Sequence, residues 1–184
     1  LKIPYVRVRA CAADADKADA TVCRYLEALV PEAEKENVTL LLETVGIYAD
    51  TSKLCAVLDR FACDNLGALW DMHHTYRKAG ESAETSLKNL GAYIKHIHLK
   101  DSEMIDGKPE YRLIGEGTLP LDEMMLALRS INYDGFISLE WDPAWMPDMT
   151  DMDIILLHFT SYMLKYKSLE RAEKKLYENN LQTG

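Results

Sequence analysis

Residues that bind metal ions or move protons recur at one kind of place in this sequence, the ends of successive strand-like segments. Glu43, Asp71 and Glu140 each close such a segment, and His98 stands near the end of another. In a parallel sheet the strands all end on the same side, where active sites form. The four side chains would converge there, and mixed oxygen and nitrogen ligands suit Mn²⁺, Mg²⁺, Co²⁺ or Zn²⁺. The sequence therefore predicts a divalent metal site built from these four residues.

Each of these residue types also has an ordinary structural use. A glutamate at a strand end often caps a helix or lies at the surface, and a lone strand histidine is more often packed in a core. His96 and His98 share one face of their strand because side-chain direction alternates. His96 lies one step deeper, so we assign it a packing or supporting role, and His73 has a similar structural interpretation. Repetition at four consecutive strand ends nevertheless favours a metal site.

The apolar pattern predicts five strands, each followed by a helix or loop. The expected strands are 3–10, 38–44, 67–72, 94–100 and 136–141, and the expected helices are 19–37, 51–65, 82–90, 121–131 and about 151–166. A loop ending at Gly80 follows the third strand, and another spans 106–120. This alternation predicts a parallel sheet with crossover helices, either an open doubly wound sheet or part of a (βα)8 barrel. No glycine-rich phosphate loop follows the first strand, which weighs against nucleotide binding.

The composition argues against several classes of protein. The chain has 184 residues, 48% of them hydrophobic, with a formal net charge of −9. It is too apolar to be disordered, and its apolar runs fall short of the roughly 20 residues that cross a bilayer. The acidic balance argues against a nucleic-acid partner. Its 4 cysteines show no metal-binding spacing and the start is strand-like, so we expect a cytoplasmic protein with reduced cysteines.

Several segments resemble the sugar phosphate isomerase/epimerase family of the xylose-isomerase-like TIM-barrel superfamily. The segments that carry the resemblance are LLLET, WDMHH, HIHLKD, LIGEGTLP and GFISLEWDP, and it covers about residues 3–165. It implies a (βα)8 barrel fold and a divalent cation held by Glu43, Asp71, His98 and Glu140. The substrate-contacting histidine of the family falls on His74.

The resemblance also implies an activity, the isomerisation or epimerisation of a sugar or sugar phosphate through an enediolate. Glu43 and Glu140 would remove and return the proton, and His74 would bind a substrate oxygen. Lys100 or Arg112 would reach distal substrate oxygens. Trp141 either forms an apolar surface against the sugar ring or packs in the core.

Two alternatives stay open beside this activity. The same site could expel a β-hydroxyl, as an inosose-type dehydratase does, or the chain could be a non-catalytic domain of a larger protein. Many relatives carry His or Asn where this chain has Thr44-Val45, and a second Glu where it has Asp142. These departures bear on the carbohydrate substrate more than on the metal.

The length is short for the implied fold. A (βα)8 barrel typically needs about 250 residues, whereas five βα units are visible here, and by the resemblance they are the last five of eight. We therefore divide the chain into a partial barrel over 1–165 and an amphipathic helix or linker over 166–184. Open sheet edges favour pairing, so we expect either a covalently linked neighbouring domain or a homo-oligomer.

Overall fold

The computed structural model describes residues 3–10, 15–147 and 151–182. The chain divides into two compact units. One comprises Leu1–Leu99 and Pro120–Glu140, and the other comprises Lys100–Leu119 and Trp141–Gly184.

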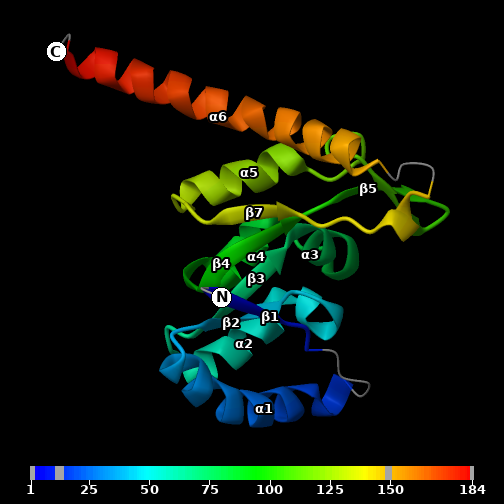
Figure 1. Cartoon of the computed structure of the whole chain (residues 1–184), viewed down its shortest axis with the longest axis vertical. Coiled ribbons are helices and arrows are strands. Elements are labelled where there is room, and N and C mark those ends of the chain that lie inside the picture. Colours follow the sequence, from blue (N-terminus) through cyan, green and yellow to red (C-terminus); the bar gives the residue numbers. More distant parts are fainter. Residues whose placement is uncertain (1–2, 11–14, 148–150, 183–184) are drawn as a thin grey trace. The chain divides into compact units, whose positions relative to one another are not determined.

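The first unit is built on a sheet of parallel strands in the order β1-β2-β3-β4-β7 (Figure 1). The strands are β1 (Tyr5–Val8), β2 (Thr39–Glu43), β3 (Leu66–Asp71), β4 (Ile94–Leu99) and β7 (Phe136–Leu139). All five expected strands are therefore present in the expected order. Every residue of β3 is buried, as is typical of a central parallel strand covered on both faces.

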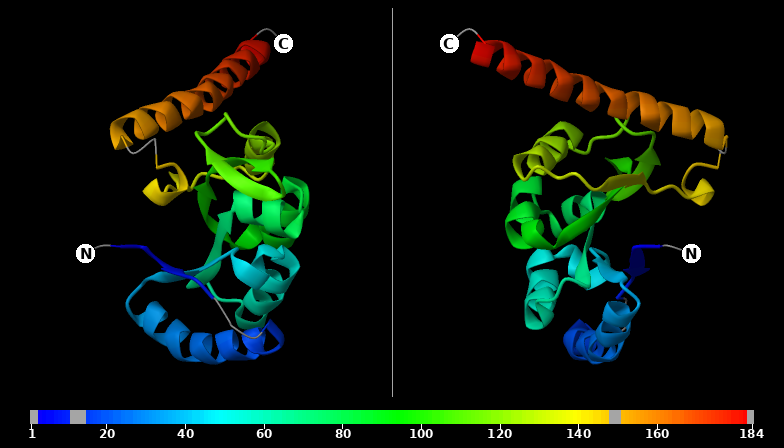
Figure 2. Two further views of the ribbon diagram at one scale, coloured as in Figure 1. Left: turned by 90° about the vertical axis from the view of Figure 1, so that its right-hand side faces the viewer. Right: turned by 60° about the vertical axis from the view of Figure 1, so that its left-hand side comes forward.

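Four helices lie along one face of this sheet (Figure 2). They are α1 (Ala15–Lys35), α2 (Thr51–Phe61), α4 (Ala83–Leu90) and α5 (Leu121–Ser130). Helix α2 packs against α4, and α4 packs against α5. The core between helices and sheet is apolar and includes the fully buried side chains of Leu54, Leu58, Trp70, Ile97 and Leu99. Parallel strands joined by crossover helices form an incomplete barrel, as the sequence predicts.

The segment after β3 differs from the sequence-based expectation. The prediction of a loop ending at Gly80 is wrong, because helix α3 (Met72–Ala79) begins directly after the strand. The Asp71 side chain caps this helix by accepting a hydrogen bond from the backbone N–H of His74 at 3.0 Å. Gly80 ends the helix in the left-handed conformation, at φ 68°. The strand end is therefore also a helix start.

The second unit contains a β-hairpin where the sequence predicts only a loop over 106–120. Strand β5 (Asp101–Ile105) pairs antiparallel with β6 (Lys108–Arg112). Asp106 and Gly107 connect them with φ of 49° and 75°. Positive φ at both central residues is the type I′ geometry that suits the twist of a two-residue hairpin, and Asp-Gly is a favoured pair there.

Asp101 holds the rest of that loop in place. Its carboxylate accepts backbone N–H bonds from Gly115 at 2.9 Å, Gly117 at 3.0 Å and Leu119 at 3.2 Å. A Cβ on Gly117 would lie 2.2 Å from Oδ1 of Asp101, so only glycine allows this close approach. The LIGEGTLP segment is thus a loop wrapped around one buried carboxylate.

The last helix of the second unit is longer than the sequence suggests. Helix α6 runs over Met152–Gln182 as one element, through the expected boundary at 165, and His158 lies 2.8 Å from the carbonyl oxygen of Ile114. Short 3-10 turns complete the fold at Gly46–Ala49, Gly91–Tyr93 and Pro143–Trp145. Across the described part of the chain, no helix combines the length and apolarity needed to cross a membrane.

The Asp101 carboxylate should be the main stabilising contact of the 113–119 loop. Replacing it in Asp101→Asn turns an amide N–H₂ toward backbone donors, and we expect the free energy of unfolding to fall by about 2 kcal/mol or more. Asp106→Asn is the matched control, because it changes an exposed hairpin residue that tolerates positive φ and should alter stability by about 0.5 kcal/mol at most. Urea unfolding measures both. Equal stability of the two variants would contradict the assignment.

Candidate metal centre

The four predicted ligands lie together in the first unit. Glu43 ends β2 and Asp71 ends β3. His98 is the second-to-last residue of β4, and Glu140 follows β7 directly. Each offers one ligand atom, and these atoms all lie within 4.8 Å of one another. Glu43 and Asp71 are fully buried, and His98 is almost so.

The register of the sheet explains why residues at different strand positions meet. Asp71 and His98 are direct partners across β3 and β4. Glu43 lies opposite the residue two before Asp71, and Glu140 stands two after the sheet partner of His98. Steps of two keep all four side chains on the same face, since direction alternates along a strand. A staggered register of this kind is what tilts the strands of a barrel.

The His98 ring faces two carboxylates without bonding to either. Its Nδ1 lies 3.7 Å from Oε1 of Glu43 and 3.6 Å from Oε1 of Glu140. Both distances exceed the roughly 3.2 Å of an ordinary N–H···O bond. This atom is buried and has no hydrogen-bond partner among the residues that the structure describes. Two ligands about 2.1 Å from one tetrahedral ion would lie about 3.4 Å apart, so the spacing fits a shared divalent cation.

Charge shifts the pKa values of this cluster in opposite directions. Burial lowers the pKa of His98, but the Glu140 and Glu43 carboxylates outweigh it and raise the value above the ordinary 6.5. Burial raises the pKa of Glu43, but the His98 ring and the Arg7 guanidinium outweigh it and hold the value below 4.5. The site therefore favours the charged forms of both groups.

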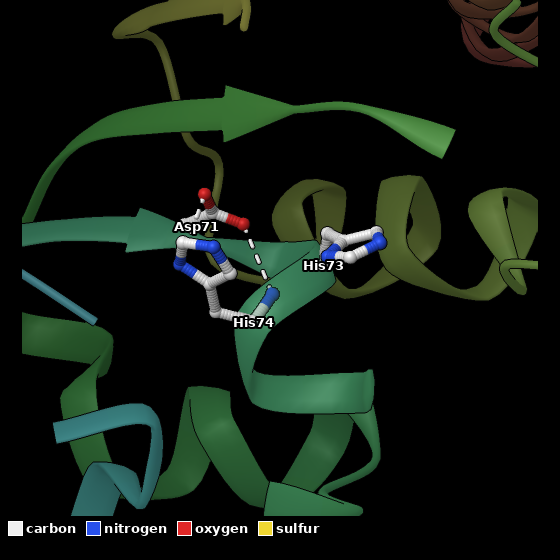
Figure 3. Close-up of side chains that lie close together, drawn as sticks. All are labelled: Asp71, His73 and His74. Atoms are coloured by element: carbon white, nitrogen blue, oxygen red, sulfur yellow. Dashed lines mark hydrogen bonds and ion pairs between the residues drawn. The ribbon is translucent and has the colours of Figure 1, made fainter. Parts of the chain in front are cut away.

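Asp71 and His74 form a second contact at the same strand end. Nδ1 of His74 lies 3.2 Å from Oδ2 of Asp71 and 3.1 Å from the carbonyl oxygen of Thr44. Two oxygen neighbours assign the proton to Nδ1, which leaves Nε2 as the accepting nitrogen of the neutral ring. Figure 3 shows the His74 ring beside the Asp71 carboxylate and the His73 ring turned away from both.

Thr44 contacts both Asp71 and His74. Its hydroxyl accepts a hydrogen bond from the Asp71 backbone N–H at 2.8 Å and lies 3.2 Å from the Asp71 carbonyl oxygen. The residue that departs from the family pattern thus fixes the backbone of one ligand and, through its own carbonyl, the ring of His74.

Three predicted substrate-binding residues belong to the second unit. Lys100 is buried, with Nζ 5.5 Å from the ring centre of Trp145. Arg112 pairs with Glu110 at 3.0 Å and with Glu103 at 3.5 Å. The indole Nε1 of Trp141 is buried without a hydrogen-bond partner in the described residues. Their contact with a substrate stays a prediction.

Arg7 is the functional candidate that the sequence analysis missed. It lies on β1, and its Nη2 is 2.5 Å from Oε1 of Glu43 and 2.7 Å from Oε1 of Glu140. The segment YVRVRA reads as an ordinary strand. The available signal was the arginine at every second residue, which places both on one face of an otherwise apolar strand.

Comparison with known proteins places the chain in a family. The family model described as xylose isomerase-like TIM barrel matches residues 3–157. The chain belongs to this family. The resemblance expected from the sequence is therefore confirmed, and so is the incomplete barrel fold.

The matches to individual relatives cover less than half of the length of those proteins. It is 33% identical over 122 residues to the uncharacterized protein MJ1311 of Methanocaldococcus jannaschii, which covers 62% of this chain and 41% of that protein. It is 24% identical over 116 residues to hydroxypyruvate isomerase of Escherichia coli, covering 59% and 42%. The chain thus spans about two fifths of the length of these relatives.

Solved structures share the fold. A D-tagatose 3-epimerase-like protein matches with a TM-score of 0.65 and 24% identity, covering 94% of this chain and 64% of that one. The IolI protein with a bound zinc atom matches with a TM-score of 0.66 and 22% identity, covering 86% and 61%.

The pKa directions predict how the metal-free protein responds to pH. Because the folded state raises the pKa of His98, protonated His98 stabilises the fold fully below pH 6.5, and this contribution disappears as pH rises through the raised value. The folded state lowers the pKa of Glu43, so the stability that its ionised carboxylate contributes is lost as pH falls below 4.5. Thermal unfolding in EDTA should therefore show a difference between the wild type and His98→Gln that shrinks from pH 6 toward pH 9. A difference independent of pH would contradict the assignment.

Proposed function

We propose that this chain carries the metal centre of a divalent-metal-dependent isomerase or epimerase of carbohydrates, with or without a phosphate group. The observation that supports it most is the convergence of Glu43, Asp71, His98 and Glu140, with the buried Nδ1 of His98 spaced as a ligand from two carboxylates. The names of the compared proteins, an isomerase and an epimerase-like protein, agree with this class. Carbohydrate metabolism in the cytoplasm is part of the proposal.

The four ligands would hold Mn²⁺, Mg²⁺, Co²⁺ or Zn²⁺, and the chemistry of their donors is compatible with each. When bound, the ion supplies Lewis-acid polarisation of a substrate carbonyl and the neighbouring hydroxyl. The protein's own residues would do the remaining work. Asp71 and His98 fix the geometry, because one is held by the helix cap and Thr44 and the other by the strand register.

The proton is transferred by the two glutamates in this proposal. Glu43 has a lowered pKa and is ionised at neutral pH, as a base must be. Glu43 and Glu140 lie at similar distances from Nδ1 of His98. In this proposal they act from opposite faces of a bound substrate, and one removes the proton while the other returns it. The Nε2 of His74 could bind a substrate hydroxyl, because Nδ1 carries the proton.

The proton transfer predicts a specific loss in Glu140→Gln. Wild-type protein with Mn²⁺, Co²⁺ or Zn²⁺ should exchange a substrate C–H for deuterium in D₂O, followed by NMR over a panel of ketoses, inososes and hydroxypyruvate. The variant should keep its fold and lose exchange by about 10²- to 10⁴-fold at saturating metal, the usual contribution of a general base or acid.

Glu27→Gln is the matched control, because Glu27 is an exposed glutamate paired with Arg60 on the helical side of the sheet. It should exchange at the wild-type rate. Wild-type exchange in Glu140→Gln would refute the proton-transfer assignment. A dehydrated product would instead support the dehydratase alternative, and no retained ion by elemental analysis after soaking would support a non-catalytic domain.

A further inference from the structure

The guanidinium of Arg7 lies among the atoms proposed to bind the metal. Its Nη2 bridges Oε1 of Glu43 and Oε1 of Glu140, and its Nε donates to Oε2 of Glu43 at 3.0 Å. The two Oε1 atoms are the same atoms that face Nδ1 of His98. Arg7 thus contacts two of the four proposed ligands at the oxygens that face His98.

Electrostatics gives a reason for this contact. Three carboxylates meet here, and those of Glu43 and Asp71 have no exposed surface. Gathering buried like charges is costly unless a positive charge lies among them. A guanidinium supplies that charge in a fork that fits two carboxylates.

A divalent cation bound here would share the Oε1 atoms of Glu43 and Glu140 with the guanidinium. A metal–oxygen bond is about 2.0–2.2 Å long, so an ion bound by both Oε1 atoms would lie beside Nη2 at a distance where two cations repel. The Arg7 side chain is 35% exposed, so it has room to move into solvent.

We propose that Arg7 is the resident counter-ion of the metal-free centre, and that a divalent cation binds by displacing its guanidinium from Glu43 and Glu140. The proposal rests on the metal centre proposed above. It makes Arg7 a positioning residue: it holds the two carboxylates in place before the metal arrives and sets how tightly the metal binds.

This exchange predicts effects of opposite sign, which an ordinary stabilising salt bridge does not. Removing Arg7 should destabilise the metal-free protein, because the carboxylates lose their counter-ion. It should also strengthen metal binding, because the ion no longer competes with a guanidinium. A purely structural residue would, on removal, weaken both.

The test compares Arg7→Met with wild type by calorimetric titration of Zn²⁺ and Co²⁺ and by thermal unfolding in EDTA. We expect metal dissociation constants about 10- to 100-fold lower in the variant, the equivalent of losing one charge-assisted contact. We expect its metal-free melting temperature to fall by roughly 4 °C.

Arg9→Met is the matched control. Arg9 follows β1 directly, two residues after Arg7, and its Nε lies 3.2 Å from Oε2 of Glu43, with a more exposed side chain than that of Arg7. Its removal should change the metal dissociation constant by less than about threefold, because the two Oε1 atoms keep their contacts with Arg7. Arg7→Lys covers the case in which Arg7→Met does not fold: it keeps the charge but loses the fork, and should bind metal more tightly than wild type by a smaller factor.

The outcomes separate this inference from the function on which it rests. Unchanged or weaker metal binding in both Arg7 variants, with clear binding by wild type, overturns the exchange and leaves the metal centre standing. Failure of wild type and all variants to bind either ion overturns the metal centre and the exchange together.

Discussion

Everything at the candidate site follows from the concentration of negative charge at one end of a parallel sheet. Three carboxylates and an imidazole lie within a few ångströms, and the carboxylates of Glu43 and Asp71 are entirely shielded from water. Such a cluster is stable only when positive charge compensates it, from protonated His98, from Arg7 and Arg9 or from a bound cation. This unbalanced negative charge is the electrostatic reason for proposing a cation site here.

The surrounding fold restrains each member of the cluster. Asp71 is fixed three times, as the last residue of a buried strand, as the cap of α3 and by the Thr44 hydroxyl on its backbone. His98 is held by the register between β3 and β4. Rigid neighbours of this kind keep ligand atoms at fixed spacing, which is what both metal binding and proton transfer require.

The second unit uses similar chemistry for a structural purpose. Asp101 stands two residues after the end of β4, yet its carboxylate accepts the backbone N–H groups of the 113–119 loop. A buried aspartate after a strand is therefore not by itself a site residue. What distinguishes Asp71 is that its carboxylate, besides capping α3, lies within 4.8 Å of the candidate ligand atoms of Glu43, His98 and Glu140.

The sequence by itself determined the order of strands, the family and the four residues that converge at the candidate metal centre. Parallel strands buried on both faces are strongly apolar, so the polar residues at their ends are easily recognised. It did not reveal α3, because Asp71 is both the last residue of β3 and the cap of that helix. The capping bond to the His74 backbone N–H is visible only in the structure. It did not reveal the hairpin, because Asp106-Gly107 is equally common in an irregular loop and only the pairing of β5 with β6 makes it a two-residue turn. Above all it did not reveal Arg7, which is 36 residues from Glu43 and 133 from Glu140 along the chain. The pairing of β1 with β2 brings that charge to Glu43. Glu140 follows β7 at the opposite edge of the sheet, so only the closure of the strands into a partial barrel brings it to the same guanidinium.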